Sequence, residues 1–524
     1  MPLYEHPPVR LDSPESIATV YHQRICEVLS IKHNRNGNPW RMIVWPLAQE
    51  HPVVYHAIAA MTCFQRSNTI LEMRQLGMRH WKISARALLL HQNDSIDIKV
   101  ELTATLALSL AETWYYPRST CGINYVQAAK RLLQATILPS STSSATASLE
   151  RSYSDMVPFN FLARTWVYMD VLTQITCEDA EAFDAKFSTR CGSGIGPMPA
   201  IYDDQIDPLM GCAGSLFPLL GRVADLARTV RKRQTRPNSP AIVANAVELS
   251  MSIGRWKPCA GITSGFSNND DEGIMLAASD LVQTANAYKW ATLLLLCQAV
   301  PELPICYSFK SIAEKILIFI ATVPVESKAS IFHVFPLLIA GCDATEREDR
   351  DWVYDRWHRL SSGNSSGISD RCLDLTSEVW KRRDSYDEQE QDLEGRASKN
   401  APTRSRCGGF TIISKLHWLS VMKQWGWEGN FLRASITSFS VMQTDSFSPF
   451  GGRCVAKLMA LALSAISPYL NKFGTGLVPN RWPRLTHIVT GFTDAPPSLF
   501  GLLARATSTP AEEQGFKRVY APQS

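Results

Sequence analysis

Long apolar runs and an excess of charge of one sign are both missing from this sequence. Its strongest apolar runs, residues 290–300, 316–325 and 458–466, fall short of the roughly 20 residues that a bilayer-spanning helix needs. The 53 basic side chains are balanced by 49 acidic ones, and a net charge of +4 does not by itself draw a protein to nucleic acid. We therefore expect no membrane partner, and the overall charge says nothing about DNA.

Closely spaced cysteines are missing as well, because none of the 13 cysteines forms a C-x-x-C pair. Most of them lie inside apolar runs, where a free thiol packs as a small hydrophobic group. Their odd number, and an N-terminus without a continuous apolar core, predict a reducing compartment and no export. No nucleophile, base and orienting group occur at a diagnostic spacing, so we expect no enzyme and assign no catalytic, cofactor-binding or metal-ligating residue.

Helical periodicity is what the sequence does contain. Apolar residues recur at three- and four-residue steps in successive segments, with no strand-like alternation between them. A length of 524 residues and a hydrophobic fraction of 45% suit one large globular domain or several smaller ones. We predict an all-α fold, an irregular array of antiparallel helices with no substantial β-sheet.

The segment 207–224, DPLMGCAGSLFPLLGRVA, is the most informative part of the chain. Asp207 is a typical N-cap residue, and Pro208 suits the first helical position because its missing N–H would have no partner there. The apolar residues that follow predict one packing helix, which begins at Pro208 and continues to about Val230.

The same segment resembles the middle-homology, or regulatory, domain of fungal zinc-cluster transcription factors, in which a DPL, G, SLF and PL run precedes a helix. Other segments of the chain also resemble the family and occur in its order, and the whole set covers roughly residues 14 to 428. These segments are 38–61 (NPWRMIVWPLAQEHPVVYHAIAAM), 168–172 (YMDVL), 287–304 (AYKWATLLLLCQAVPELP), 335–353 (FPLLIAGCDATEREDRDWV), 378–384 (EVWKRRD) and 416–428 (LHWLSVMKQWGWE). The resemblance implies an all-α domain that acts in the nucleus and regulates transcription. Control of a metabolic or secondary-metabolite gene cluster is common in that family.

Composition divides the chain into successive parts. We expect a flexible N-terminus at 1–13, a helical regulatory domain at 14–384, a disordered polar insertion at 385–410 and the domain's C-terminal helix at 411–428. Residues 429–524 are an extension whose status the sequence leaves open: a genuine extension with a helix over Val455–Leu470, or translated non-coding sequence.

The zinc cluster of the resembled family has no counterpart in this sequence. Such a cluster needs six thiolates in a short segment, and Cys26 is the one cysteine among the first sixty residues. We therefore expect no cofactor in this chain, and a zinc cluster only if an N-terminal module is missing from it. Direct DNA binding by these residues is in doubt.

One compact basic cluster follows the segment 207–224. It consists of Arg228, Arg231, Lys232, Arg233 and Arg236. Nuclear import or contact with phosphate is one hypothesis for it. The other is structural, because cations at the C-terminal end of a helix complement the helix dipole.

Other polar groups have ordinary interpretations. The glycines of CGSGIGPMPA at 191–200 predict a loop, because their spacing is not that of a phosphate-binding turn. His51 and His56 lie off one helical face, and His80 and His91 stand alone, which argues against metal ligation. The acids of 343–356 alternate with arginines, which favours ion pairs on a helix surface over acid–base chemistry or a cation site.

Aromatic side chains suggest a core and, less directly, an effector. Core packing is the default for each of them, including Trp166, Tyr168, Tyr288, Trp290, Trp352, Trp357, Trp380 and Trp418. Some relatives sense small hydrophobic molecules through this domain, so a small apolar effector is a second hypothesis, with its pocket residues unknown.

Our leading hypothesis is a nuclear transcriptional regulator that acts through this helical domain. Its partners would be other transcription factors or coregulators, in homo- or heterodimers. The alternative is a helical cofactor or scaffold that does not bind DNA and pairs with a full-length transcription factor through an apolar helix face.

Overall fold

The computed structural model describes most of the chain up to residue 428. The described residues are 12–32, 37–67, 70–90, 97–115, 122–137, 153–181, 183–193, 206–234, 236–259, 271–304, 307–362, 368–396 and 411–428. Throughout these ranges the regular structure is helical, which confirms the predicted all-α fold. Within them, the β-type pairing is limited to one isolated bridge between Asp207 and Gly211.

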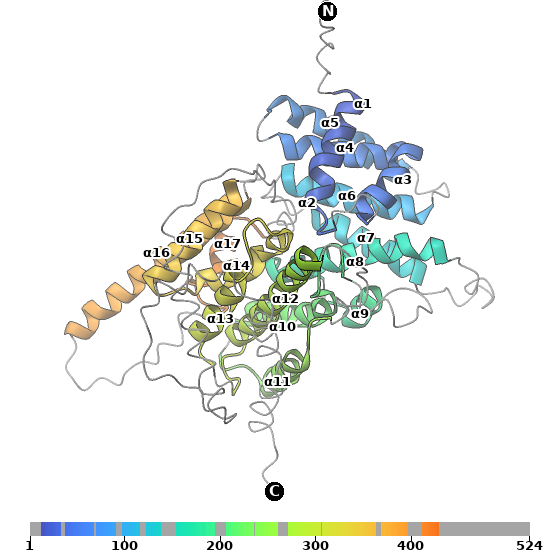
Figure 1. Ribbon diagram of the computed structural model, residues 1–524. Coiled ribbons are helices and arrows are strands. Elements are labelled where there is room, and N and C mark those ends of the chain that lie inside the picture. The colour runs from blue at the N-terminus through green and yellow to red at the C-terminus, as the bar shows by residue number, and fades with distance from the viewer. Residues whose placement is uncertain are drawn as a thin grey trace, which may run out of the picture.

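The N-terminal helices form a layer at one end of the molecule (Figure 1). α1 (Pro14–Val20) continues through one π-helical turn into α2 (Cys26–Val28). The layer also contains α3 (Trp45–Glu50), α4 (Pro52–Arg66), α5 (Glu72–Leu90), α6 (Ile98–Tyr115) and α7 (Gly122–Ile137). α4 packs against both α5 and α6, so it is the central helix of the layer.

The remaining helices form a second, larger group. They are α8 (Tyr153–Thr176), α9 (Ala185–Ser193), α10 (Phe217–Arg233), α11 (Pro240–Arg255), α12 (Asp271–Ala299), α13 (Phe309–Ala321), α14 (Val334–Cys342), α15 (Arg347–Ser362), α16 (Ile368–Arg396) and α17 (Trp418–Gln424). Each packs mainly against helices near it in the chain, such as α8 with α10, α12 with α13 and α16 with α17. This sequential packing is the irregular helical array that the sequence predicts.

One hydrophobic core runs through both groups, from Tyr21 to Trp427. At their junction the ring of Trp40 meets Phe161 edge to face, with ring centroids 5.6 Å apart. Nearby, the backbone N–H of Ile31 donates to the carbonyl of Pro208 at 2.9 Å. The two groups of helices therefore form one folded unit.

Local sequence signals explain several helix ends. The Ser13 hydroxyl caps α1 by accepting the N–H of Ser16 at 3.1 Å. His51 has extended backbone angles between α3 and α4, and Pro52 takes the first position of α4, so these two residues divide the segment into two helices.

The predicted start of the helix at Pro208 is wrong. The Asp207 carboxylate does accept the N–H groups of Leu209 and Met210, both at 2.8 Å, but it caps a tight turn. Asp207 and Gly211 exchange two backbone hydrogen bonds across that turn, and Gly211 has φ +56°, which ends any helix there. The long helix, α10, begins at Phe217 after a short 3-10 turn.

The boundary that we placed at 384 also needs correction. α16 continues past it to Arg396, so residues 385–396 are helical, contrary to the expected disordered insertion. A run of glutamate and glutamine is compatible with a helix, and its high charge did not indicate where the helix ends. Residues 1–11, 397–410 and 429–524, including the expected helix at 455–470, lie outside the described residues.

Candidate functional site

The predicted basic cluster lies at the C-terminal end of α10, and its cations do not share one exposed surface. Arg228 is buried and donates to the carbonyl of Ala180 at 2.8 Å, and it also pairs with Asp225. Arg236 pairs with Glu302 at 3.4 Å. Lys232 and Arg233 are exposed. Of the five cations, Lys232 and Arg233 make none of these internal contacts. Nuclear import or phosphate contact through this segment stays a prediction.

Arg231 connects α10 to the C-terminal segment of the domain. It is buried and lies 3.0 Å from the carboxylate of Glu428 and 3.8 Å from that of Glu178, which precedes α9. Lys423 of α17 also pairs with Glu178. Burial raises the pKa of the Glu428 carboxyl, and Arg231 partly offsets this by lowering it. These four charged groups fasten residues 411–428 to the end of α10.

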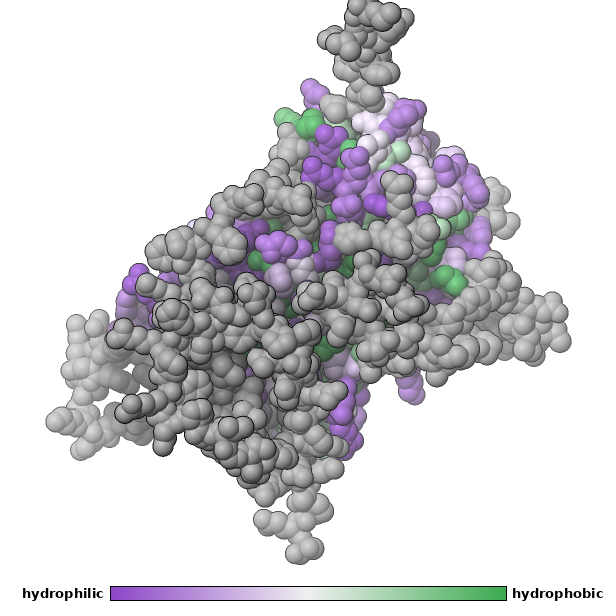
Figure 2. Space-filling view, viewed as in Figure 1, coloured by the Kyte–Doolittle hydropathy of each residue, from purple (hydrophilic) through white to green (hydrophobic). Residues whose placement is uncertain are grey.

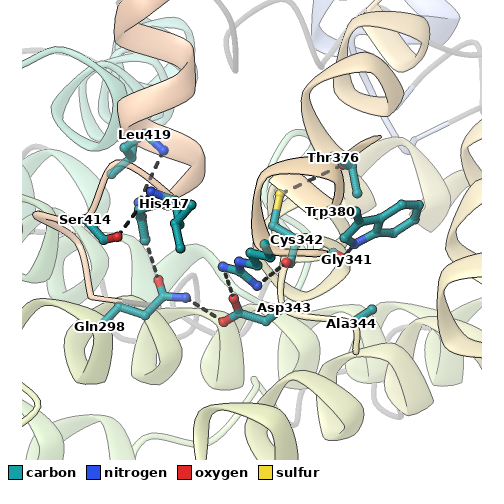
Figure 3. Close-up of polar contacts among 12 residues, drawn as sticks. Gln298, Gly341, Cys342, Asp343, Ala344, Thr376, Trp380, Ser414, His417 and Leu419 are labelled. Carbon is teal, nitrogen blue, oxygen red and sulfur yellow. Dashed lines mark hydrogen bonds and ion pairs between the residues drawn. The ribbon is translucent and has the colours of Figure 1, made fainter. Parts of the chain in front are cut away.

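A second group of buried polar side chains joins the same segment to three other helices (Figure 3). We call Gln298, Asp343, Arg383 and His417 the buried polar junction. Arg383 of α16 donates to the Asp343 carboxylate at 2.7 Å, and it also donates to the carbonyl of Cys342. Gln298 of α12 donates to the other carboxylate oxygen of Asp343 at 2.7 Å. The Gln298 side-chain oxygen then lies 3.0 Å from Nε2 of His417.

The hydrogen bonds of the junction define the protonation of His417. Its Nδ1 accepts the backbone N–H of Leu419 at 3.2 Å, and this contact caps the start of α17. The proton must therefore be on Nε2, which donates to Gln298. Burial lowers the pKa of His417 well below its usual range, and the cations Arg383 and Arg231 lower it further. The imidazole is neutral, so the junction holds one ion pair and two neutral groups.

A third polar cluster lies beneath α15. Nδ1 of the buried His333 lies 3.3 Å from a guanidinium nitrogen of Arg356, and its Nε2 lies 3.0 Å from the Thr284 hydroxyl. Arg356 also donates to the carbonyl of Val323 at 2.9 Å. Burial lowers the pKa of His333 well below its usual range, which keeps the ring neutral beside the arginine. Arg356 is thus a core residue, although the sequence placed it among surface ion pairs.

Three acids of the segment 343–356, namely Glu346, Asp351 and Asp355, form surface ion pairs. Glu346 pairs with Lys310 at 2.5 Å and Asp351 with Arg347 at 4.0 Å. Asp343 differs from these three, because its carboxylate is buried in the polar junction. Among the described residues, no group of three or more His, Cys, Asp and Glu side chains is arranged to hold a metal ion.

The histidines that appeared isolated in the sequence are not all isolated in the structure. Nδ1 of His56 on α4 lies 2.7 Å from Nδ1 of His80 on α5. One ring must donate and the other must accept, so at most one of these two nitrogens carries a proton. Burial, with the neighbouring His56, lowers the pKa of His80 to about 4. His91, Gly194 and Gly196 lie outside the described residues, and Gly192 belongs to α9.

The large aromatic side chains pack in the core, as their default interpretation predicts. Tyr168, Phe217, Tyr288 and Phe335 form a row in which successive ring centroids are 5.5, 5.6 and 5.9 Å apart. Two surface grooves of the described part have volumes of about 540 and 300 Å³, and both are lined by charged residues as well as aromatic ones. A small apolar effector stays a prediction, since neither groove is the largely apolar pocket that suits one.

Only part of this site could be found from the sequence. The segments LHWLS and GCDATERE that carry His417 and Asp343 were noted for their resemblance, but nothing in their spacing shows that they meet. Gln298 sits in an otherwise apolar helix, LLLLCQAV, and a lone polar residue in such a run is the one local signal of a buried hydrogen-bond network.

Comparison with known proteins gives the family. The fungal-specific transcription factor domain matches residues 16–432, which is more than half of the chain and nearly all of its described part. The chain belongs to the fungal-specific transcription factor domain family. Family membership supports a role as a transcription regulator and, in general, a nuclear one. No curated protein and no solved structure matches this chain.

Across the described residues of this fungal-specific transcription factor domain, no helix combines the length and the apolar character needed to cross a membrane.

Proposed function

We propose that this chain regulates transcription through contacts of its helical domain with other proteins, and that it performs no chemical reaction of its own. The observation that supports the proposal is the family match over residues 16–432, which coincides with one continuous hydrophobic core. A domain with one core transmits a binding event through its packing, which is what a regulatory domain needs.

The polar junction supports a regulatory role for the C-terminal segment. Residues 411–428 return to the body after a long connection and are held there by hydrogen bonds to Gln298 and by the Arg231–Glu428 ion pair. A partner that releases the segment must replace these contacts, because breaking a buried ion pair leaves an uncompensated charge. We expect the target genes to belong to a metabolic or secondary-metabolite cluster, as is common in the family.

A tethering experiment tests the proposal. The whole chain is fused to a heterologous DNA-binding module, and the output of a reporter gene carrying that module's site is measured. We expect the output to rise or fall several-fold relative to the module alone. An equally expressed, nuclear fusion that leaves the output unchanged contradicts the proposal.

The absence of a C-x-x-C pair from the whole sequence favours a second candidate function. The chain would then act as a cofactor that reaches DNA only through a full-length transcription factor. Chromatin immunoprecipitation of the tagged chain distinguishes the two candidate functions. It is carried out with and without each transcription factor that copurifies with the chain. Loss of chromatin occupancy when one such factor is deleted supports the cofactor role, and unchanged occupancy in every deletion contradicts it.

A further inference from the structure

Two cysteines from separate segments of the chain meet in the fold. Cys212 lies in the turn between Asp207 and α10, and Cys259 follows the C-terminal end of α11. The thiol of Cys212 is hydrogen-bonded to that of Cys259. A disulfide bond is about 2.05 Å long, and two thiols already in contact can approach this distance by small rotations of their side chains. The pair is therefore placed for a cross-link between the two segments.

Other contacts hold the end of α11 against this turn. Nε1 of Trp256 donates to the hydroxyl of Ser215 at 3.0 Å, and each of these residues is three positions from one of the two cysteines. The carbonyl of Gly254 accepts a hydrogen bond from Nζ of Lys289 on α12 at 3.2 Å. Trp256 and Cys259 also pack against the hydrophobic core. The two sulfur atoms are thus kept together by the packing around them.

Cys259 is more accessible than the other thiols of the described residues. Of the nine cysteines in these ranges, eight are buried and Cys259 is half-buried. Figure 2 shows mainly hydrophilic residues at the described surface of the N-terminal helices, whose cysteines Cys26 and Cys63 are buried. A small oxidant dissolved in water therefore reaches Cys259 more readily than it reaches the eight buried thiols.

The hydrogen bond between the two thiols gives them different roles. This bond and burial both raise the pKa of the Cys212 thiol, so Cys212 keeps its proton and donates it to the sulfur of Cys259. A sulfur that accepts a hydrogen bond is stabilised as a thiolate, which is the nucleophilic form of cysteine. Cys259 is thus the sulfur that reacts first, and Cys212 is the neighbouring thiol that can react with its product.

We propose that Cys212 and Cys259 are a redox-modification site, which closes to a disulfide when the chain meets hydrogen peroxide. The Cys259 thiolate attacks one peroxide oxygen, so that an S–O bond forms, the O–O bond breaks and hydroxide leaves. The Cys212 sulfur then attacks the sulfur of the resulting sulfenic acid. The S–S bond forms, the S–O bond breaks, and the hydroxyl group leaves with the Cys212 proton as water. The two cysteines lose two electrons, and the peroxide that accepts them is reduced to water.

The cross-link ties the end of α11 to a turn that also contacts the N-terminal helices. In that turn, the carbonyl of Pro208 accepts the backbone N–H of Ile31. Disulfides in a reducing compartment are usually transient, so the closed form would persist only while peroxide is present. The inference concerns a modification of the chain and does not depend on its role in transcription.

A second pair of cysteines provides an internal comparison. Cys342 and Cys372 interact electrostatically, so they too are neighbours. Both are 0% exposed, and the Cys342 thiol donates to the hydroxyl of Thr376 at 3.9 Å (Figure 3). Because water does not reach these two sulfurs, we expect the pair to stay reduced in the folded chain.

Mass spectrometry of the whole chain tests the proposal. The folded, reduced chain is treated with hydrogen peroxide, its remaining thiols are blocked with N-ethylmaleimide under denaturing conditions, and disulfide-linked peptides are quantified with and without dithiothreitol. The variants are C212A and C259A, and the matched control is C177A, which removes a buried cysteine outside the pair. Circular dichroism confirms that each variant is folded, and dimedone traps any sulfenic acid.

We expect the Cys212–Cys259 link in the wild type and in C177A, at least about tenfold more abundant than a Cys342–Cys372 link, and its loss on treatment with dithiothreitol. C212A should accumulate dimedone-labelled Cys259, whereas C259A should leave Cys212 reduced. The proposal is overturned if the peroxide-treated wild type contains no Cys212–Cys259 link, or if the link forms only after the chain is unfolded. Oxidation of Cys212 in C259A to the same extent as in the wild type overturns it too.

Discussion

The guanidinium of Arg383 donates to the carboxylate of Asp343 at 2.7 Å, with only 5% and 3% of the two side chains exposed. An ion pair this deeply buried is costly to form but still more costly to break, because removal of one partner leaves a bare charge in the core. It also anchors Gln298, which in turn holds His417 and the start of α17.

Replacement of Asp343 by alanine is expected to destabilise the domain strongly. Arg383 would keep its charge without a counter-ion, so the free energy of unfolding should fall by about 3–5 kcal/mol, measured by urea denaturation. The control is Asp351→Ala, which removes an exposed pair whose side chains are 95% and 76% exposed and should change little. Equal effects of the two substitutions would contradict a special role for the buried pair.

Replacement of Arg231 by methionine is expected to loosen residues 411–428 in particular. Glu428 and Glu178 would lose their shared cation, so the backbone amides of α17 should exchange with deuterium at least about tenfold faster than in the wild type. Arg233→Met makes the same chemical change at an exposed position two residues away and is the control. If exchange in α17 is the same in both variants, Arg231 does not fasten that segment.

The contact between His56 and His80 predicts a dependence of stability on pH. The pKa of His80 is about 4 in the folded chain and lies near 6.5 when the chain unfolds. A depressed pKa contributes stability that is complete above pH 6.5 and is lost as the pH falls toward 4. His80→Gln should therefore flatten the decline in unfolding free energy between these values, while His358→Gln, at an exposed position, leaves it as in the wild type. An unchanged slope in His80→Gln would rule out this contribution.

The turn at Asp207 predicts a difference between two substitutions. Asp207→Ala removes the oxygen that accepts two backbone N–H groups at 2.8 Å, which should cost about 1–2 kcal/mol in a thermal unfolding measurement. Asp207→Asn keeps that oxygen and loses only the charge near Arg164, which lies 3.7 Å away, so it should cost less. If Asp207→Asn lowers the stability as much as Asp207→Ala does, these hydrogen bonds do not stabilise the turn.

Local patterns were enough to find most helices. The apolar periodicity of segments such as 122–137 and the proline at position 52 report on contacts within one helix turn, and these depend on neighbouring residues alone. The start of α10 was missed because a capping aspartate followed by proline suits a helix and a tight turn equally well. The left-handed backbone of Gly211, with φ +56°, decides between them.

Most of the candidate site, by contrast, could not be predicted from local sequence patterns. The run of cations at 228–236 is plain in the sequence, but whether each cation faces water or a carboxylate depends on residues as distant as Glu428. His56 and His80 likewise appeared unrelated until the packing of α4 on α5 brought their rings together. Pairings between distant segments leave no trace in the spacing of residues along one sequence.

The amino-acid sequence by itself determined the helical class of this protein, the order of its helices and its family, because periodicity, caps and short ordered motifs are local properties of the chain. Only the tertiary structure decided which charges are buried and paired, where α10 begins, and that α5 presents exposed cations beside exposed leucines. These features depend on desolvation and on the position of distant side chains, and both arise only when the helices pack.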